Sequence, residues 1–294
     1  MPPLALALVL SAALLHALWN LGAKKAKGDH HFVFTSAIGV GVLWAPPALW
    51  AGWSQIPHWP AAAWACAITS AAIHMIYFST LLKGYRVSDL NVVYPVARGS
   101  GPLVSSLAAT LLFGEHLGPA GMLGLFSIVA GILLIAAGPQ LWRSSGDDER
   151  ARQRRHQGLL WGALTGLTIS GYTLVDGYAV KVLAISPLVI DWVGNVFRIG
   201  FALPAVLRDR AGFVPAFKRQ WPYVLMMAVM SPLAYILVLY AMQIAPVSRV
   251  APMRELSMLV AAALGGQLLK EGDRLWRLLG AGFIAGGVIG LAGL

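Results

Sequence analysis

Ten runs of about 20 mostly apolar residues, joined by short connections, decide what this chain can fold into. A bilayer core roughly 30 Å thick is crossed by about 20 such residues in a helix, and barrel strands are only about half that length. Only 12% of the side chains are charged, about half the proportion that is usual in water-soluble domains. The sequence therefore predicts an all-α polytopic membrane protein whose ten spans cover residues 4–23, 32–52, 61–82, 90–113, 118–138, 158–183, 188–207, 223–244, 250–269 and 275–294.

The formal net charge of +10 at pH 7 sits mostly in the connections between the spans. Of the 22 Lys and Arg residues, 17 follow the first, third, fifth, seventh and ninth spans. Because Lys and Arg are enriched in cytoplasmic loops, these odd-numbered loops are predicted to be cytoplasmic, with both termini on the outer side of a bacterial inner membrane. Charge distributed in this way is a topology signal. It excludes a nucleic-acid partner, which would need a clustered basic face outside the membrane.

The second half of the chain repeats the first after a shift of 156 residues. The shift aligns Arg98 with Arg254 and Glu115 with Glu271. It predicts two five-helix repeats, residues 1–138 and 158–294, joined by a cytoplasmic linker at 139–157. Because each repeat has an odd number of spans, the second enters the membrane in the opposite sense. Inverted repeats of this kind are typical of carriers.

Two stretches at corresponding places in the halves resemble a known family. The first EamA repeat of the drug/metabolite transporter superfamily is similar to residues 89–135, DLNVVYPVARGSGPLVSSLAATLLFGEHLGPAGMLGLFSIVAGILLI. The second is similar to residues 246–291, PVSRVAPMRELSMLVAAALGGQLLKEGDRLWRLLGAGFIAGGVIGL. The resemblance implies a ten-helix exporter of small metabolites or amino acids. Within the superfamily, the subgroup it suggests is the YddG-type exporters of aromatic amino acids.

Polar side chains at helical spacing indicate which spans line a cavity, because polar groups in hydrocarbon face a cavity or a partner. Such stripes lie on spans 1, 3, 4, 6, 8 and 9, and span 7 contributes. Spans 5 and 10 are almost free of polar residues. Span 10 carries Gly282, Gly286 and Gly290 at a spacing that permits close helix contact, so both are predicted to be scaffold or dimer-contact helices of a monomer or weak homodimer. The predicted substrate-binding residues are His74, Tyr77, Tyr94, Arg98, Trp161, Tyr172, Asp176 and Arg254.

The charged residues inside the spans leave two substrate classes open. An arginine can hold a carboxylate by two parallel hydrogen bonds while an acid binds an ammonium and aromatic rings receive the side chain, which favours export of an amino acid by alternating access. A multidrug exporter of lipophilic cations would instead leave Asp176 or Glu255 unpaired in an aromatic cage, with the arginines turned away. Asp176, Glu255 and His74 are also candidates for proton coupling. Internal ion pairs, such as Asp191 with Arg198, would explain the same charges without a ligand.

No motif for a catalytic, metal or cofactor centre accompanies these features. The single cysteine, Cys66, lies in an apolar run, and no histidine inside a span has a partner at metal-ligand spacing. Neither a metal nor a cofactor is therefore expected, and without a nucleophile–base pair an enzyme is not expected either. Trp161 lies near the end of its span, where an interfacial belt of aromatic residues is an alternative to substrate contact.

Overall fold

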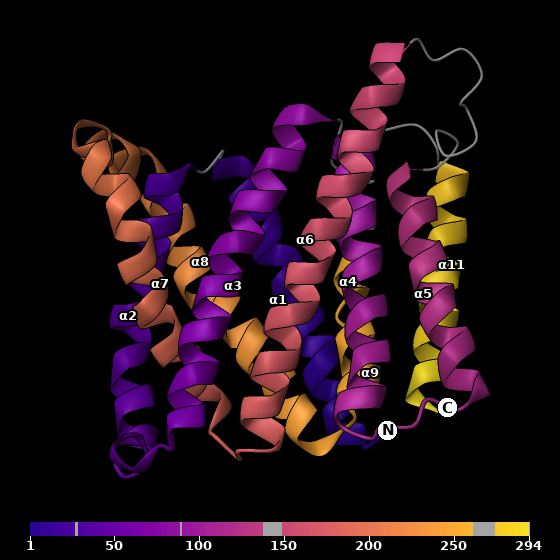
Figure 1. Ribbon diagram of the computed structural model, residues 1–294, viewed down its shortest axis with the longest axis horizontal. Helices are drawn as coiled ribbons and strands as arrows, with labels where there is room; N and C mark the ends of the chain where they lie inside the picture. Colours follow the sequence, from indigo (N-terminus) through magenta and orange to yellow (C-terminus); the bar gives the residue numbers. More distant parts are fainter. Residues whose placement is uncertain (27–28, 89, 138–148, 261–273, 294) are drawn as a thin grey trace.

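The computed structural model describes residues 1–26, 29–88, 90–137, 149–260 and 274–293 (Figure 1). The elements in chain order are α1 Pro3–Ala26, α2 His30–Gly52, η1 Ile56–His58, α3 Ala61–Val87, α4 Leu90–Leu112, α5 Pro119–Ala137, α6 Glu149–Lys181, α7 Pro187–Arg208, α8 Arg210–Ile244, α9 Val247–Met253 and α11 Arg274–Ala292. Six of them, α1, α2, α3, α6, α7 and α8, are long and apolar enough to cross a membrane, and α5 and α11 carry shorter apolar segments. For the described residues, this confirms the predicted helical class, which fits a polytopic membrane protein.

The helices run between two ends of the bundle, which we call the basic end and the terminal end. The basic end holds the connections that follow α1, α3 and α7, and the first turns of α6 extend beyond the other helices there (Figure 1). The terminal end holds both termini and the connections that follow α2, α4, α6 and α8. The termini are held together because the amino group of Met1 donates a hydrogen bond to the carbonyl oxygen of Ala292 at 2.7 Å.

α5 and α11 pair with each other at one side of the bundle, as expected of scaffold helices (Figure 1). Their backbones approach so closely that a Cβ added to Gly131 would lie 2.5 Å from the carbonyl oxygen of Gly280. Gly282 and Gly286 do not take part in this contact, since among the described residues nothing lies within 4 Å of a Cβ added to either of them, and a role in a dimer contact stays a prediction. Gly290 does lie in the contact, 2.9 Å from the carbonyl oxygen of Ala120 by the same measure.

Alanine at Gly131 is therefore expected to destabilise the protein by about 1–3 kcal/mol, because the added methyl group meets rigid backbone on α11. Gly282→Ala is the matched control, since it adds the same methyl group to a helix face that the described residues leave open. Thermal unfolding in detergent would measure both. Equal unfolding temperatures for the two variants would contradict the close contact.

Two helices begin earlier than their hydrophobicity predicts. α8 begins at Arg210 where the apolar run begins at 223, and α6 begins at Glu149, inside the segment predicted as a linker. Apart from His156, the added turns of α6 consist of Glu, Arg, Gln and Ala, which are good helix formers although most of them are polar. Hydropathy therefore located the membrane-crossing part of each helix and not its beginning.

The predicted ninth span, 250–269, is broken. α9 ends at Met253, Arg254 and Glu255 form a turn, and helix resumes over 256–260, after which the span lies outside the described residues. Pro252 lies just before the break, and it has no N–H to donate to the preceding turn. The backbone tightens to three-residue hydrogen bonds: Glu255 N–H donates to the carbonyl of Pro252 at 3.1 Å, and Ser257 N–H to that of Arg254 at 3.2 Å.

Candidate functional site

A cavity of about 270 Å³ lies inside the bundle, from its middle toward the basic end. It is near the lower limit of volume for a small-molecule site. Its wall extends to Tyr85, two residues before α3 ends at the basic end. The polar and aromatic side chains of the wall are His16, Trp19, Asn20, Ser36, His74, Tyr77, Phe78, Tyr85, Tyr94, Arg98, Thr165, Tyr172, Asp191, Asn195, Arg198, Ser231, Tyr235 and Arg254.

The terminal half of the bundle is filled by apolar side chains. Val9, Ala67, Ile190, Leu239 and Met242, which come from four helices, are almost completely buried in one hydrophobic cluster there. Among the described residues, this close packing leaves no passage for a small molecule. In that part of the chain, the cavity therefore lies on the basic side of a packed terminal half.

Most of the predicted substrate-binding residues meet at this cavity. The six that line it are His74, Tyr77, Tyr94, Arg98, Tyr172 and Arg254. Trp161 is not on the cavity wall. It lies against α3, since its Cβ is 3.2 Å from the position that a Cβ on Gly84 would occupy. Asp176 borders a separate small void that it shares with His74 and Asp191. Hydropathy reasoning missed the contribution of α2, because most of its lining residues, such as Val33 and Val40, are apolar and give no polar signal.

Two of the arginines in the cavity wall are paired with carboxylates. Arg98 Nη2 lies 2.9 Å from Glu255 Oε2, and Arg198 Nη2 lies 3.2 Å from Asp191 Oδ1. The second pair confirms the predicted pairing along α7. Both carboxylate side chains are nearly buried, and such groups are stable as ions only when a partner compensates their charge. These four charges can therefore be explained within the protein.

Arg254 differs from the other two arginines in its partners. Its Nη1 donates to Thr173 Oγ1 at 3.3 Å and its Nη2 to Tyr172 Oη at 3.4 Å. The guanidinium carbon lies 6.0 Å from the ring centroid of Tyr172 and 5.5 Å from that of Tyr235. Among the described residues, no carboxylate oxygen lies within 4 Å of this guanidinium. The turn after Pro252 thus presents a cation at a cavity wall, surrounded by hydroxyl groups and rings.

Aromatic rings form part of the cavity wall. His74 stacks on Tyr172 with centroids 4.0 Å apart, and Tyr235 meets the edge of His74 at 6.1 Å. His74 Nδ1 lies 2.8 Å from the carbonyl oxygen of Ser70, so the tautomer with the proton on Nδ1 satisfies this contact. The hydroxyl of Tyr235 donates a hydrogen bond to Asp176. These aromatic rings therefore border an arginine, and the Asp176 carboxylate already has a hydrogen-bond partner in Tyr235.

Glu115 joins three segments at the terminal end, opposite the cavity. Its Oε1 accepts hydrogen bonds from Lys181 Nζ at 2.6 Å and from the Val247 N–H at 2.8 Å, and its Oε2 accepts from the Ser248 N–H at 2.8 Å. Burial alone would raise the pKa of Glu115, but these hydrogen bonds lower the pKa below its ordinary value. The connection after α4 is thereby tied to the end of α6 and the start of α9.

Glu115→Gln is expected to destabilise the protein by about 1–3 kcal/mol, because a neutral amide oxygen cannot replace both carboxylate oxygens or pair with Lys181. Since folding lowers the pKa of Glu115, its contribution is fully present above the ordinary value near 4.5 and is lost as the pH falls through the folded value. Unfolding temperatures measured against pH should show a larger loss in the wild type than in the variant, which lacks the contribution of Glu115. His116→Ala, at the exposed neighbouring position, is the control; an equally large effect there would contradict the assignment.

Comparison with known proteins gives the chain a family context. The EamA-like transporter family matches it twice, over residues 3–137 and 156–293. Multidrug transporter PA4990 of Pseudomonas aeruginosa is 37% identical over 62 residues, 21% of this chain and 56% of that protein. Spermidine export protein MdtI of Salmonella paratyphi B is 34% identical over 68 residues, 23% of this chain and 62% of that protein. The matches thus cover less than two thirds of the length of these relatives.

A solved crystal structure shares the fold. It is 16% identical in sequence, and the superposition covers 97% of this chain and 95% of that chain with a TM-score of 0.72.

Proposed function

The chain belongs to the EamA-like transporter family, and we propose that it exports amino acids or similar small metabolites with a carboxylate group across the bacterial inner membrane. In this proposal the basic end faces the cytoplasm, so that the cavity receives its substrate from the inside. The positive-inside rule supports this orientation, because most of the Lys and Arg follow the odd-numbered predicted spans, and the helix ends after α1, α3 and α7 lie at the basic end.

The observation that carries the proposal is the environment of Arg254. Arg98 and Arg198 have carboxylate partners within the described residues, whereas Arg254 contacts only hydroxyl groups and aromatic rings. A guanidinium in a nonpolar bundle is costly without a counter-ion, and a substrate carboxylate would supply one by two parallel hydrogen bonds. Tyr172 and Tyr235 would then contact the apolar part of the substrate.

Transport by alternating access is supported by how the helices pair. If the chain is two repeats, α1, α2 and α3 correspond to α6, α7 and α8. In the structure α1 and α2 both contact α8, and their counterparts α6 and α7 both contact α3, the counterpart of α8. These are the pairings expected if residues 1–138 and 158–294 are two inverted repeats that exchange roles across a central site. In such a cycle the closed terminal half would open as the basic half closes.

A second candidate function is the export of organic cations. It is favoured by the names of the two relatives, a multidrug transporter and a spermidine export protein, over the short segments that match. Against it, the prediction for this function was an unpaired Asp176 or Glu255 with the arginines turned away. Glu255 is paired with Arg98, and Asp176 accepts a hydrogen bond from Tyr235.

Transport into proteoliposomes separates the two candidates. The purified protein would be tested with radiolabelled amino acids, spermidine and a lipophilic cation, each with and without an imposed pH gradient. Saturable transport of one or more amino acids, with none of either cation, is the expected result. Saturable transport of cations alone would overturn the proposal in favour of the second candidate.

Coupling to protons is tested by the same assay. If Asp176 carries the proton, Asp176→Asn is expected to abolish the response to the pH gradient and to leave exchange of substrate between the two sides. Full retention of gradient-driven transport in this variant would assign proton coupling elsewhere.

A further inference from the structure

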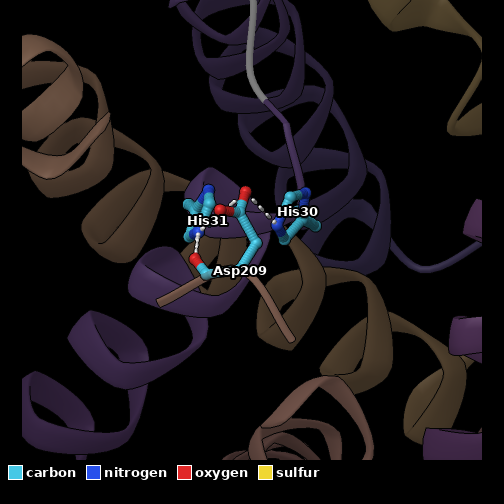
Figure 2. A group of neighbouring side chains, drawn as sticks. All are labelled: His30, His31 and Asp209. Carbon is cyan, nitrogen blue, oxygen red and sulfur yellow. Dashed lines mark hydrogen bonds and ion pairs between the residues drawn. The ribbon is translucent and has the colours of Figure 1, made fainter. Parts of the chain in front are cut away.

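Two histidines and an aspartate meet at the basic end, outside the cavity. His30 and His31 begin α2, and Asp209 occupies the corner between α7 and α8 (Figure 2). His30 Nε2 lies 3.4 Å from Asp209 Oδ2, and His31 Nε2 lies 3.7 Å from the same oxygen. One ligand atom from each of the three residues lies within 4.8 Å of the others. Segments 178 residues apart thus direct two imidazole nitrogens at one carboxylate.

These groups and distances suit a divalent transition-metal ion. Imidazole nitrogen and carboxylate oxygen both bind Zn²⁺ at about 2.0–2.2 Å, so tetrahedral ligands lie about 3.3 Å apart. The two histidine–aspartate separations, 3.4 and 3.7 Å, need only small side-chain movements to reach this value, and the ligand nitrogens of the two histidines lie within 4.8 Å of each other. Two histidines with one carboxylate leave the fourth position for a water molecule.

The surroundings orient His31 as a ligand. Its side chain is 2% exposed, and its Nδ1 lies 3.7 Å from Asp29 Oδ2 on the side away from Asp209. A carboxylate behind the second ring nitrogen fixes the tautomer of metal-binding histidines and makes them more basic. Gly212 makes room for the ring, since a Cβ there would lie 2.9 Å from His31 Cε1. Without a metal, His31 Nε2 donates to the carbonyl oxygen of Asp209 at 2.8 Å; coordination through Nε2 would leave the ring proton on Nδ1, the nitrogen that faces Asp29.

We propose that His30, His31 and Asp209 form a binding site for a divalent transition-metal ion of the Zn²⁺ type. The ion fastens the start of α2 to the corner between α7 and α8. Val33, one turn along α2, lies on the cavity wall, so the site stands at the rim of the cavity on its basic side. This inference is independent of the substrate that the cavity carries.

Cobalt binding tests the site directly. Protein purified in detergent through an affinity tag without histidines would be titrated with Co²⁺, whose visible absorption reports tetrahedral coordination. One equivalent is expected to bind, and Zn²⁺ should displace it. His30→Ala and Asp209→Asn should each abolish the tetrahedral band. Asn at 209 retains a side-chain oxygen for the hydrogen bond from the Gly212 N–H, so the start of α8 should persist.

Two further variants sharpen the test. Asp29→Asn removes the charge behind His31 and is expected to weaken Co²⁺ binding about 10- to 100-fold without removing a ligand. His58→Ala removes an exposed histidine at the terminal end and should leave binding unchanged. Wild-type protein without a tetrahedral band, or an equal band in His30→Ala, would overturn the site as adventitious. Unfolding temperatures measured without metal confirm that each variant is folded.

Discussion

Arg254→Gln is expected to reduce transport at least about 30-fold, the largest loss at any single position of the cavity. Removing one partner of a buried, hydrogen-bonded charge pair costs roughly 2–5 kcal/mol, and 2 kcal/mol corresponds to about 30-fold in affinity. The glutamine amide keeps a hydrogen-bond donor at this position and removes only the charge and the fork, so the loss falls mainly on the substrate carboxylate. Initial rates of uptake into proteoliposomes over a range of substrate concentrations would measure it.

Two other variants decide what the loss at Arg254 means. Arg254→Lys keeps the charge without the planar fork and is expected to recover part of the transport. Arg249→Gln is the matched control, because Arg249 lies on α9 but not on the cavity wall. Undiminished transport of carboxylates by Arg254→Gln would exclude Arg254 as the anchor. Loss of transport in Arg249→Gln as well would indicate damage to α9 and not to a binding contact.

Glu255→Gln is expected to destabilise the protein by about 3–5 kcal/mol, the largest effect on stability. The variant leaves the Arg98 guanidinium, which is only 13% exposed, without its carboxylate 2.9 Å away. Arg98→Met alone should cost a similar amount, because it leaves the Glu255 carboxylate buried without a partner. Unfolding temperatures in detergent would compare both variants with the wild type.

The double variant Arg98→Met/Glu255→Gln provides the decisive comparison. If the single variants are unstable because each leaves an uncompensated charge, the double variant should recover most of the lost stability, since a buried ion pair is often replaceable by neutral groups. Transport should remain impaired, because Arg98 is part of the cavity wall. Additive losses in the double variant would show that the two side chains do not act as a pair.

The sequence predicted several residues of the cavity wall, but it could not separate them from polar residues that face a buried partner. Polar residues at helical spacing identified Tyr94, Arg98 and Tyr172, because a polar side chain in hydrocarbon has few places to face other than a cavity. The same rule cannot distinguish a cavity from a buried partner. It therefore placed Asp176 with them, whereas the structure places Asp176 behind Tyr235.

The break in the predicted ninth span could not be predicted from the sequence. Pro252 was visible in an otherwise apolar run, yet proline in a membrane helix is often tolerated when neighbouring groups satisfy the backbone. Only the packed structure shows the turn at Arg254 and Glu255 that directs one charge to the cavity wall and the other to Arg98. The two inverted repeats and the orientation in the membrane stay predictions.

The sequence by itself determined that this chain forms apolar helices in a membrane, because the length and hydrophobicity of each run must match the bilayer. Tertiary structure decided which faces meet. Gly131 and Gly280 lie in the contact between α5 and α11, whereas Gly282 does not, although all three are glycines in apolar helices. Likewise, the two neighbouring histidines at the start of α2 match no metal-binding motif in the sequence. The packing of α7 and α8 brings Asp209 within 4.8 Å of them. Such contacts depend on the rotation and register of packed helices, which hydropathy along a single chain does not specify.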